Sequence, residues 1–177
     1  IQGLLDMMAI PYTSSGRMAS AVAMDKPAAK KIFASAGIPV PEERVVTRAE
    51  AERGDLMERP YVIKPVNEGS SVGVIIVRDK EHNPFAAGEW HYGDSKVLVE
   101  QYVPGRELAA AVMDGKALGV VEIKVTGNGF YDYDAKYRPG GSVHEMPARL
   151  SKTAYEACMK IAETAHRVLG CRGVTRV

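Results

Sequence analysis

Five short apolar runs, rich in β-branched residues, constrain the fold of this chain more than any other feature. Turn residues separate the runs, which lie at residues 61–64, 72–77, 96–101, 107–113 and 117–124. Runs of this length between turn signals are typical of β-strands, and they predict an antiparallel or mixed sheet. One helix, over residues 84–90, is expected to interrupt them.

Helices are expected in front of this sheet region. Asp25 is placed to cap a helix over residues 26–36, and Gly37 marks its end. A strand over residues 44–47 and a polar helix over residues 48–58 should follow. The front of the chain is therefore predicted to be mainly helical.

The last third of the chain is expected to contain one long helix and one strand. Ser151 is placed to cap an amphipathic helix that Gly170 ends. Its apolar face consists of Ala154, Cys158, Ile161, Ala162, Ala165, Val168 and Leu169. Residues 171–177 are expected to return to strand. The fold class is thus predicted to be α+β, with a boundary near residues 37–41.

Composition excludes several classes of protein. The chain has 177 residues, 46% of them hydrophobic and 25% charged, and its formal net charge is +1. This balance is typical of one medium or two small globular domains and excludes a disordered chain. The near-zero charge, without a basic block, argues against binding to nucleic acid or to an anionic membrane. No apolar run approaches the roughly 18 residues of a membrane span.

The cysteines and the two ends of the chain bear on its cellular context. Cys158 and Cys171 are too far apart for a CxxC pair and too few for a disulfide framework, which predicts a reducing compartment, by default the cytoplasm. The first residues have neither an initiator Met nor the layout of a signal peptide. Residues 173–177 are expected to begin a strand, so we expect the chain to be a fragment of a longer protein.

Several familiar motifs are present only in part. Residues 69–73 match G-x-S-x-G, but a nucleophile elbow needs a helix next, and a strand is expected there, which excludes a hydrolase. His144 and Glu145 begin an H-E-x-x-H zinc motif that Ala148 breaks. Residues 132–136 begin like a calcium loop but place a cation where an oxygen ligand belongs. Neither a Walker A motif nor G-x-G-x-x-G occurs, so no metal site and no common phosphate loop is predicted.

Phosphate binding is the chemistry that the lysines and a loop of small residues favour. Lys64 ends an apolar run and is followed by Pro65, which suits a phosphate contact or, equally, an edge-strand lysine. The loop at residues 67–73 can bring backbone N–H groups and hydroxyls close to a phosphate. Lys26 lies in the first turn of its helix, where the macrodipole disfavours a cation unless an anion binds nearby.

Two further segments leave alternatives open. The connector at residues 100–107 bends at Pro-Gly, so its backbone can hydrogen-bond a purine edge while Glu107 accepts from ribose hydroxyls; the alternative is a solvated connector. Residues 126–146, rich in glycine and tyrosine, are expected to form a long ordered loop or lid. Its aromatic and basic residues are more typical of a loop that closes over a substrate than of a surface that binds single-stranded nucleic acid. Arg176 suits either a structural ion pair or an oxyanion.

A set of segments spread over the whole chain points to one family. They are residues 4–13, 18–21, 24–26, 62–65, 68–73, 130–133, 135–137 and 169–173. Together they closely resemble the D-alanine:D-alanine ligases of the ATP-grasp superfamily. The resemblance implies an ATP-grasp fold: a helical start at residues 1–40, a central small α+β subdomain at 41–103, and part of the C-terminal ATP-grasp subdomain at 104–177, with the lid loop at 126–146.

The resemblance also implies roles for individual residues. Lys26, Lys64 and Lys136 would contact ATP phosphates. Glu100 and the hinge formed by Tyr102 and Val103 would hold adenine, and Glu107 the ribose. Ser70 and Tyr137 would orient the incoming amino group, and Arg176 would stabilise the oxyanion of a tetrahedral intermediate. The further ATP-site candidates are Glu68, Ser71 and Phe130.

The implied reaction joins two D-alanine molecules at the expense of ATP, through an acylphosphate, to make the dipeptide for peptidoglycan. The alternatives are another ATP-grasp carboxylate–amine ligase and a nucleotide-binding segment without catalysis. Family members also carry an N-terminal domain and, just beyond the position of Arg176, ligands for two magnesium ions, so Mg²⁺ is expected to bind outside this chain. A homodimer is implied by the same resemblance.

Overall fold

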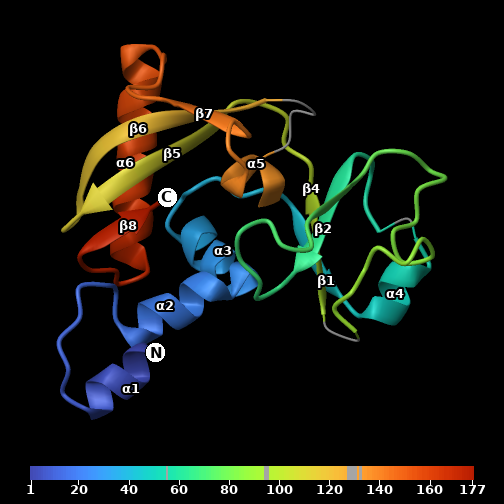
Figure 1. Ribbon diagram of the computed structural model, residues 1–177, viewed down its shortest axis with the longest axis horizontal. Helices are drawn as coiled ribbons and strands as arrows, with labels where there is room; N and C mark the ends of the chain where they lie inside the picture. Colours follow the sequence, from blue (N-terminus) through green and yellow to red (C-terminus); the bar gives the residue numbers. More distant parts are fainter. Residues whose placement is uncertain (55, 94–95, 127–130, 132) are drawn as a thin grey trace.

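Two antiparallel sheets of four strands form the framework of the chain (Figure 1). This computed structural model describes residues 1–54, 56–93, 96–126, 131 and 133–177. The strands of the first sheet, in spatial order, are β1 (Glu43–Val46), β4 (Val97–Gln101), β2 (Tyr61–Pro65) and β3 (Ile75–Val77). Those of the second are β7 (Ser142–Glu145), β6 (Lys116–Val125), β5 (Glu107–Met113) and β8 (Val174–Arg176).

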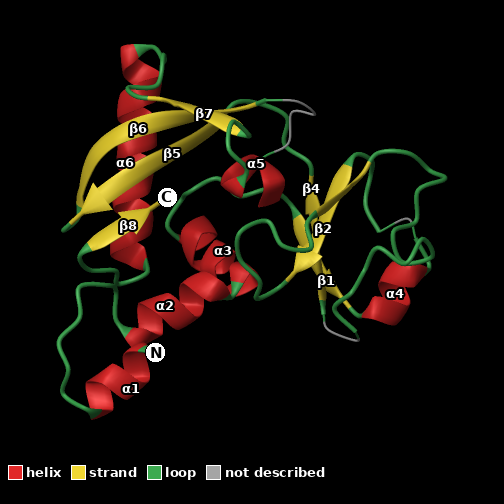
Figure 2. Cartoon of the chain, in the orientation of Figure 1, coloured by secondary structure: helices red, strands yellow, loops and turns green. Residues whose placement is uncertain are grey.

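The helices lie beside and between these sheets (Figure 2). They are α1 (Gln2–Met7), α2 (Arg17–Met24), α3 (Lys26–Ser35), α4 (Arg48–Glu52), α5 (Tyr133–Tyr137) and α6 (Lys152–Val168). Helix α6 packs on β5 and β6, whereas α3 and α5 lie between the two sheets (Figure 1). The predicted α+β class is confirmed, and every strand pair is antiparallel.

The two longest helices begin at the predicted caps. The Asp25 carboxylate accepts a hydrogen bond from the Ala28 amide at 3.0 Å, and the Ser151 hydroxyl accepts one from the Ala154 amide at 3.2 Å. Each bond satisfies a backbone donor that the first turn of a helix leaves free. Beyond α3, Gly37 has a φ of +75°, which favours glycine and stops the helix.

Alternation along β2 decides which of its residues face the first core. Tyr61 and Ile63 are buried in that core together with Val77, Val97 and Val99. Successive side chains of a strand point to opposite faces. Lys64 therefore lies on the other face of the sheet, where its side chain is 20% exposed.

The second core lies between α6 and its sheet. It consists of Ala110, Val112, Val120, Ala148 and Ala162. The predicted apolar face of α6 is confirmed at Ala162 and Ala165, while Ile161 lies at the edge of the contact and stays 39% exposed. The same face carries a buried polar residue, His166, whose Nδ1 lies 2.8 Å from the Thr175 hydroxyl on β8.

The helix predicted over residues 84–90 is wrong, because this segment forms turns. The Asn83 side chain accepts hydrogen bonds from the amides of Phe85 and Ala86, as in a cap, but Gly88 has a φ of +71°. That conformation ends the turn before a helix can propagate.

Three further predicted elements differ in extent. Helix α4 ends at Glu52, since Gly54 takes a φ of +75°. Strand β3 begins at Ile75 instead of residue 72, because Gly73 has a φ of +70°. The segment 126–146 is not one continuous loop: it contains α5 and β7, and its residues 127–130 and 132 lie outside the described residues.

Within the described residues, no helix is long and apolar enough to cross a membrane. The strands of the first sheet lie inside the predicted 41–103 subdomain and those of the second inside 104–177. The subdomain boundaries themselves stay a prediction.

Candidate functional site

Three segments meet between the two sheets (Figure 1). They are the N-terminus of α3, the small-residue loop (residues 67–73) and α5. Together they carry the predicted site residues Lys26, Glu68, Ser70, Ser71, Lys136 and Tyr137. The Lys26 amide donates to the Val66 carbonyl at 3.3 Å, which ties α3 to the start of the loop. The Ser70 and Tyr137 hydroxyls lie 2.6 Å apart, which ties the loop to α5.

The Lys26 ammonium anchors the start of the small-residue loop. It donates to the Pro65 carbonyl at 3.0 Å, to the Val66 carbonyl at 3.2 Å, and to the Glu68 carbonyl. Burial, and next the positive charge of Lys64, hold the pKa of Lys26 below its usual range. Lys26 therefore lies within electrostatic reach of Lys64, and its donors are directed at backbone carbonyls. Glu68 contributes its backbone carbonyl to this set of contacts, and the residue as a whole is exposed.

Lys64 forms an ion pair with Glu100, which also binds a second lysine. The Lys30 ammonium donates to Oε1 of Glu100 at 2.8 Å, while Lys64 pairs with Oε2. Burial raises the pKa of Glu100, but Lys64 and Lys30 outweigh this effect and hold that pKa below its ordinary value. Sequence reasoning missed Lys30, although its position four residues after Lys26 places both on one side of α3.

The small-residue loop has an unusual backbone. Ser70 and Ser71 have φ values of +52° and +58°, a region that non-glycine residues rarely adopt. Gly73 has a φ of +70°, and a Cβ at this position would overlap the ring of Tyr92. Strained backbone of this kind concentrates at ligand-binding and catalytic sites.

Helix α5 and the loop are joined by a chain of polar contacts. The Lys136 ammonium donates to the Ser71 hydroxyl at 2.8 Å, and that hydroxyl donates to the Tyr131 carbonyl at 3.0 Å. Lys136 also lies 5.1 Å from the centre of the Tyr131 ring. The predicted residues Ser70, Ser71, Lys136 and Tyr137 are thus brought together, although more than 60 positions separate the loop from α5.

Glu107 and Arg176 lie within electrostatic reach of Lys136. Partial burial raises the pKa of Glu107, and Lys136 and Arg176 oppose this effect. Burial also lowers the pKa of Lys136, which Glu107 counteracts. Strand β8 pairs Arg176 with Ala111 of β5, the strand that Glu107 begins, and this pairing brings the charges together.

The predicted adenine hinge lies in the connector between the sheets. The Tyr102 amide donates to the Pro60 carbonyl at 3.3 Å, and the guanidinium carbon of Arg78 lies 5.5 Å from the centre of the Tyr102 ring. Val103 is 66% exposed. Phe130, the remaining predicted ATP-site residue, lies outside the described residues.

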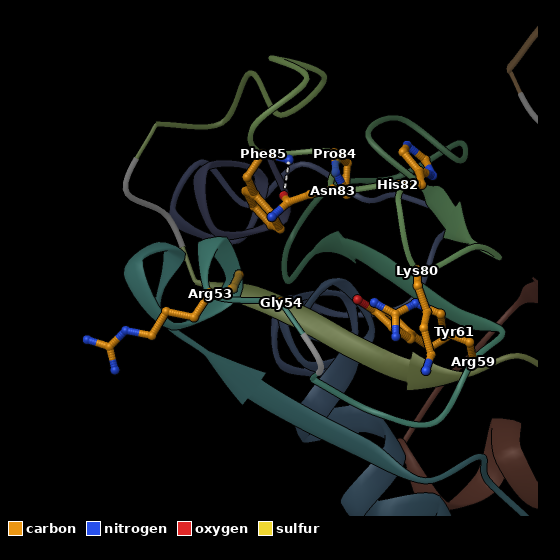
Figure 3. Close-up of a pocket in the computed structure, with 10 residues that line it drawn as sticks. Arg53, Gly54, Arg59, Tyr61, Lys80, His82, Asn83, Pro84 and Phe85 are labelled. Atoms are coloured by element: carbon orange, nitrogen blue, oxygen red, sulfur yellow. Dashed lines mark hydrogen bonds between the residues drawn. The ribbon is translucent and has the colours of Figure 1, made fainter.

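A separate cavity of about 430 Å³ lies beside the first sheet, next to the buried Tyr61 of β2 (Figure 3). Its lining residues are Ala51, Arg53, Gly54, Arg59, Tyr61, Lys80, His82, Asn83, Pro84 and Phe85. Arg53 points away from the other labelled side chains (Figure 3). None of the predicted site residues lines this cavity. Lys64 and Tyr61 are on opposite faces of β2, so the cavity is distinct from the site between the sheets.

Comparison with known proteins identifies the family. A family model described as "D-ala D-ala ligase C-terminus" matches residues 32–177. The D-alanine–D-alanine ligase of Paramagnetospirillum magneticum is 54% identical over 176 residues, which cover 99% of this chain and 57% of that protein. The corresponding enzyme of Agrobacterium fabrum is 51% identical over 179 residues, covering 99% and 58%. The chain thus spans less than two thirds of the curated relatives it matches.

Solved structures agree with the sequence comparison. The D-alanine–D-alanine ligase of Bacillus anthracis superimposes with a TM-score of 0.80 at 33% identity, over 99% of this chain and 58% of that one. The VanG D-Ala:D-Ser ligase of Enterococcus faecalis gives 0.81 at 33% identity, over 99% and 53%. These matches confirm the expected fold, an α+β fold that corresponds to part of the ATP-grasp structures of these ligases. The chain belongs to the D-alanine–D-alanine ligase family.

Proposed function

We propose that this chain serves the ATP-dependent ligation of two D-alanine molecules to D-alanyl-D-alanine, which supplies peptidoglycan synthesis. The observation that carries the proposal is the hydroxyl pair of Ser70 and Tyr137, 2.6 Å apart, beside the hydrogen bond between Lys136 and Ser71. A lysine ammonium beside a loop of hydroxyl groups can bind a phosphate group. A pair of adjacent hydroxyls can accept hydrogen bonds from an amino group. The 54% identical relative named D-alanine–D-alanine ligase supports the same reaction.

The phosphates of ATP are proposed to bind around the small-residue loop. Lys64 on β2 and Lys136 on α5 would form charge-assisted hydrogen bonds to phosphate oxygens. Lys26 already donates to carbonyls of residues 65–68, so its own contact with a phosphate requires the exchange of one of these bonds. Ser71, which accepts from Lys136, is proposed to line the same site.

The adenosine part is proposed to lie along the connector. Backbone groups at Tyr102 and Val103 would bind the purine edge, and Glu107 would accept from ribose hydroxyls. Glu100 begins this segment, but its carboxylate is held by two lysines. We therefore assign Glu100 a part in placing Lys64 beside the nucleotide. Glu68 and Phe130 stay candidates from the family resemblance.

The chemistry has two steps. A carboxylate oxygen of the first D-alanine attacks the γ-phosphorus of ATP, the bond to the β,γ-bridging oxygen breaks, and ADP leaves. The amine nitrogen of the second D-alanine then attacks the acylphosphate carbon, gives up a proton, and phosphate is expelled. Ser70 and Tyr137 would accept hydrogen bonds from the amine and aim its lone pair, while Arg176 would stabilise the oxyanion.

Water must be kept from the acylphosphate between these steps. Helix α5 lies over the small-residue loop through the Tyr137 and Lys136 contacts. A segment closed in this way would shield the intermediate from hydrolysis. We propose this role for residues 126–146.

Magnesium, the partner chain and the compartment are proposed from family resemblance and composition. The described residues contain no group of three or more His, Cys, Asp or Glu side chains that could hold a metal ion. The family resemblance is the ground on which we place the ligands of Mg²⁺ elsewhere, and no step above passes through it. A homodimer is proposed, which light scattering in solution can test. The free thiols of Cys158 and Cys171 suit the cytoplasm.

Product analysis tests the proposed reaction. The longer protein to which this chain is expected to belong, mixed with ATP, Mg²⁺ and D-alanine, is expected to release ADP and form D-alanyl-D-alanine in equal amounts. Tyr137→Phe should lower kcat about ten- to hundredfold, the effect of one hydrogen bond to a charged group. Tyr133→Phe, on the same helix and similarly exposed, is the matched control and should leave kcat unchanged. ADP release without dipeptide, or an unaltered kcat in Tyr137→Phe, would contradict the proposal.

A second candidate is a ligase with a different second substrate. VanG, a D-Ala:D-Ser ligase by name, superimposes as well as the D-alanine–D-alanine ligase does. Competition between D-alanine, D-serine and D-lactate distinguishes these activities, since the dominant product identifies the substrate. ATP binding without any ligated product would instead indicate a nucleotide-binding segment that is not catalytic.

A further inference from the structure

A network of four charged side chains links α3 to β1 and β4 beside Lys64. The ammonium nitrogen of Lys30 lies 2.8 Å from Oε1 of Glu100, 2.7 Å from Oε2 of Glu43 and 3.0 Å from the Pro41 carbonyl oxygen. The contact with Glu43 is not aligned as a hydrogen bond, so it is an ion pair. The side chain of Lys30 is only 12% exposed. Contacts within the protein therefore fix the position of the Lys30 ammonium.

Strand register explains why a cation is needed at this point. Glu43 on β1 lies directly opposite Glu100 on β4. Their side chains are 19% and 9% exposed, so water screens their repulsion poorly. Like charges directly opposite each other destabilise a sheet. Lys30 contacts both carboxylates and offsets the repulsion between them.

Glu100 divides its two oxygens between two lysines. Oε1 accepts from Lys30 and Oε2 pairs with Lys64. Because Lys30 occupies one oxygen, Glu100 meets Lys64 with the other oxygen alone. The orientation of the Glu100 carboxylate, and through it the position of the Lys64 ammonium, therefore depends on Lys30.

We propose that Lys30 is a positioning residue for nucleotide binding, which acts on Lys64 through Glu100. This inference rests on the proposed function of Lys64 as a phosphate ligand. Without Lys30, Glu100 has both oxygens available for Lys64 and is repelled by Glu43. The ammonium of Lys64 would then be drawn toward β4, away from the phosphate. The phosphate contacts of the nucleotide should weaken, whereas those of the adenosine part should not.

Calorimetric titration of the chain with ATP and, separately, with adenosine tests this role. Lys30→Met should weaken ATP binding about tenfold, the lower end of the effect of one charged hydrogen bond. Adenosine affinity should stay within about twofold. Lys31→Met removes the same charge from the adjacent, exposed position of α3 and is the matched control, expected to bind both ligands like wild type.

Two further variants separate positioning from folding. Lys30→Met/Glu43→Gln removes the charge repulsion as well as the lysine, so it should regain thermal stability without regaining ATP affinity. Lys30→Arg keeps the charge and should retain most of the ATP affinity. The inference is overturned if the double variant binds ATP like wild type, or if ATP and adenosine affinity fall equally. Failure of wild type itself to bind ATP would overturn the proposed nucleotide site, which is a distinguishable result.

Discussion

Glu100 shows, at the scale of single residues, how charge holds the site together. Burial raises its pKa, but Lys64 and Lys30 together lower it by a larger amount. The pKa in the folded chain therefore lies below the ordinary value of 4.5. A carboxyl with a depressed pKa stabilises the fold above its unfolded pKa, and this contribution is lost as pH falls through the folded pKa. Glu100→Gln should therefore be less stable than wild type at neutral pH, and the difference in unfolding free energy should shrink below pH 4.5.

Chemical denaturation across a pH series measures this difference. Glu58→Gln, which alters an exposed glutamate, is the control and should follow the wild-type profile. A stability difference for Glu100→Gln that is constant with pH would show that Glu100 is not held as a charged partner of the two lysines.

A residue could be predicted where its own segment carries a recognisable pattern, even when its partner is distant in sequence. Lys64, Ser70 and Tyr137 belong to segments with a recognisable pattern, and the structure brings all three to the region between the sheets. Lys30 was missed because its importance comes from the pairing of Glu43 with Glu100 across β1 and β4. That register depends on contacts between distant segments, which no local pattern contains.

At the scale of elements, the backbone of the small-residue loop is the feature most open to test. Gly73→Ala places a Cβ at a φ of +70° and against the ring of Tyr92, which packs edge-on to Trp90 with ring centres 5.0 Å apart. We expect a loss of about 1–3 kcal/mol in unfolding free energy, the range for overpacking. Denaturant unfolding measures it.

Gly69→Ala is the matched control within the same loop. A Cβ at Gly69 meets no atom within 4 Å, and the φ of this glycine is not positive. Its unfolding free energy should stay within about 0.5 kcal/mol of wild type. Equal losses for the two variants would contradict the role assigned to the contact between Gly73 and Tyr92.

Elements were predictable where capping and periodicity agreed. Asp25 and Ser151 begin α3 and α6 as expected, since a side-chain cap acts over three residues. The segment 84–90 forms no helix, because the turn that the Asn83 side chain caps is ended by the positive φ of Gly88. Helix α5 was missed because it is short and is held by contacts with a distant loop.

At the scale of the whole molecule, the site exists only because two sheets are placed on either side of it. Antiparallel pairing was among the predicted alternatives, whereas the strand orders β1-β4-β2-β3 and β7-β6-β5-β8 were not predicted. Strand β8, at the end of the chain, pairs with β5 and carries Arg176 toward Glu107 and Lys136. Such long-range order follows from the packing of both cores and not from any one segment.

The central claim is that phosphates of ATP bind between the sheets on Lys64, and calorimetric titration of the chain with ATP tests it most directly. Lys64→Ala should weaken binding at least about tenfold, since it removes a charge-assisted hydrogen bond. Lys116→Ala, which removes an exposed lysine at the start of β6, should bind like wild type. Equal ATP affinity in wild type and Lys64→Ala would contradict the claim.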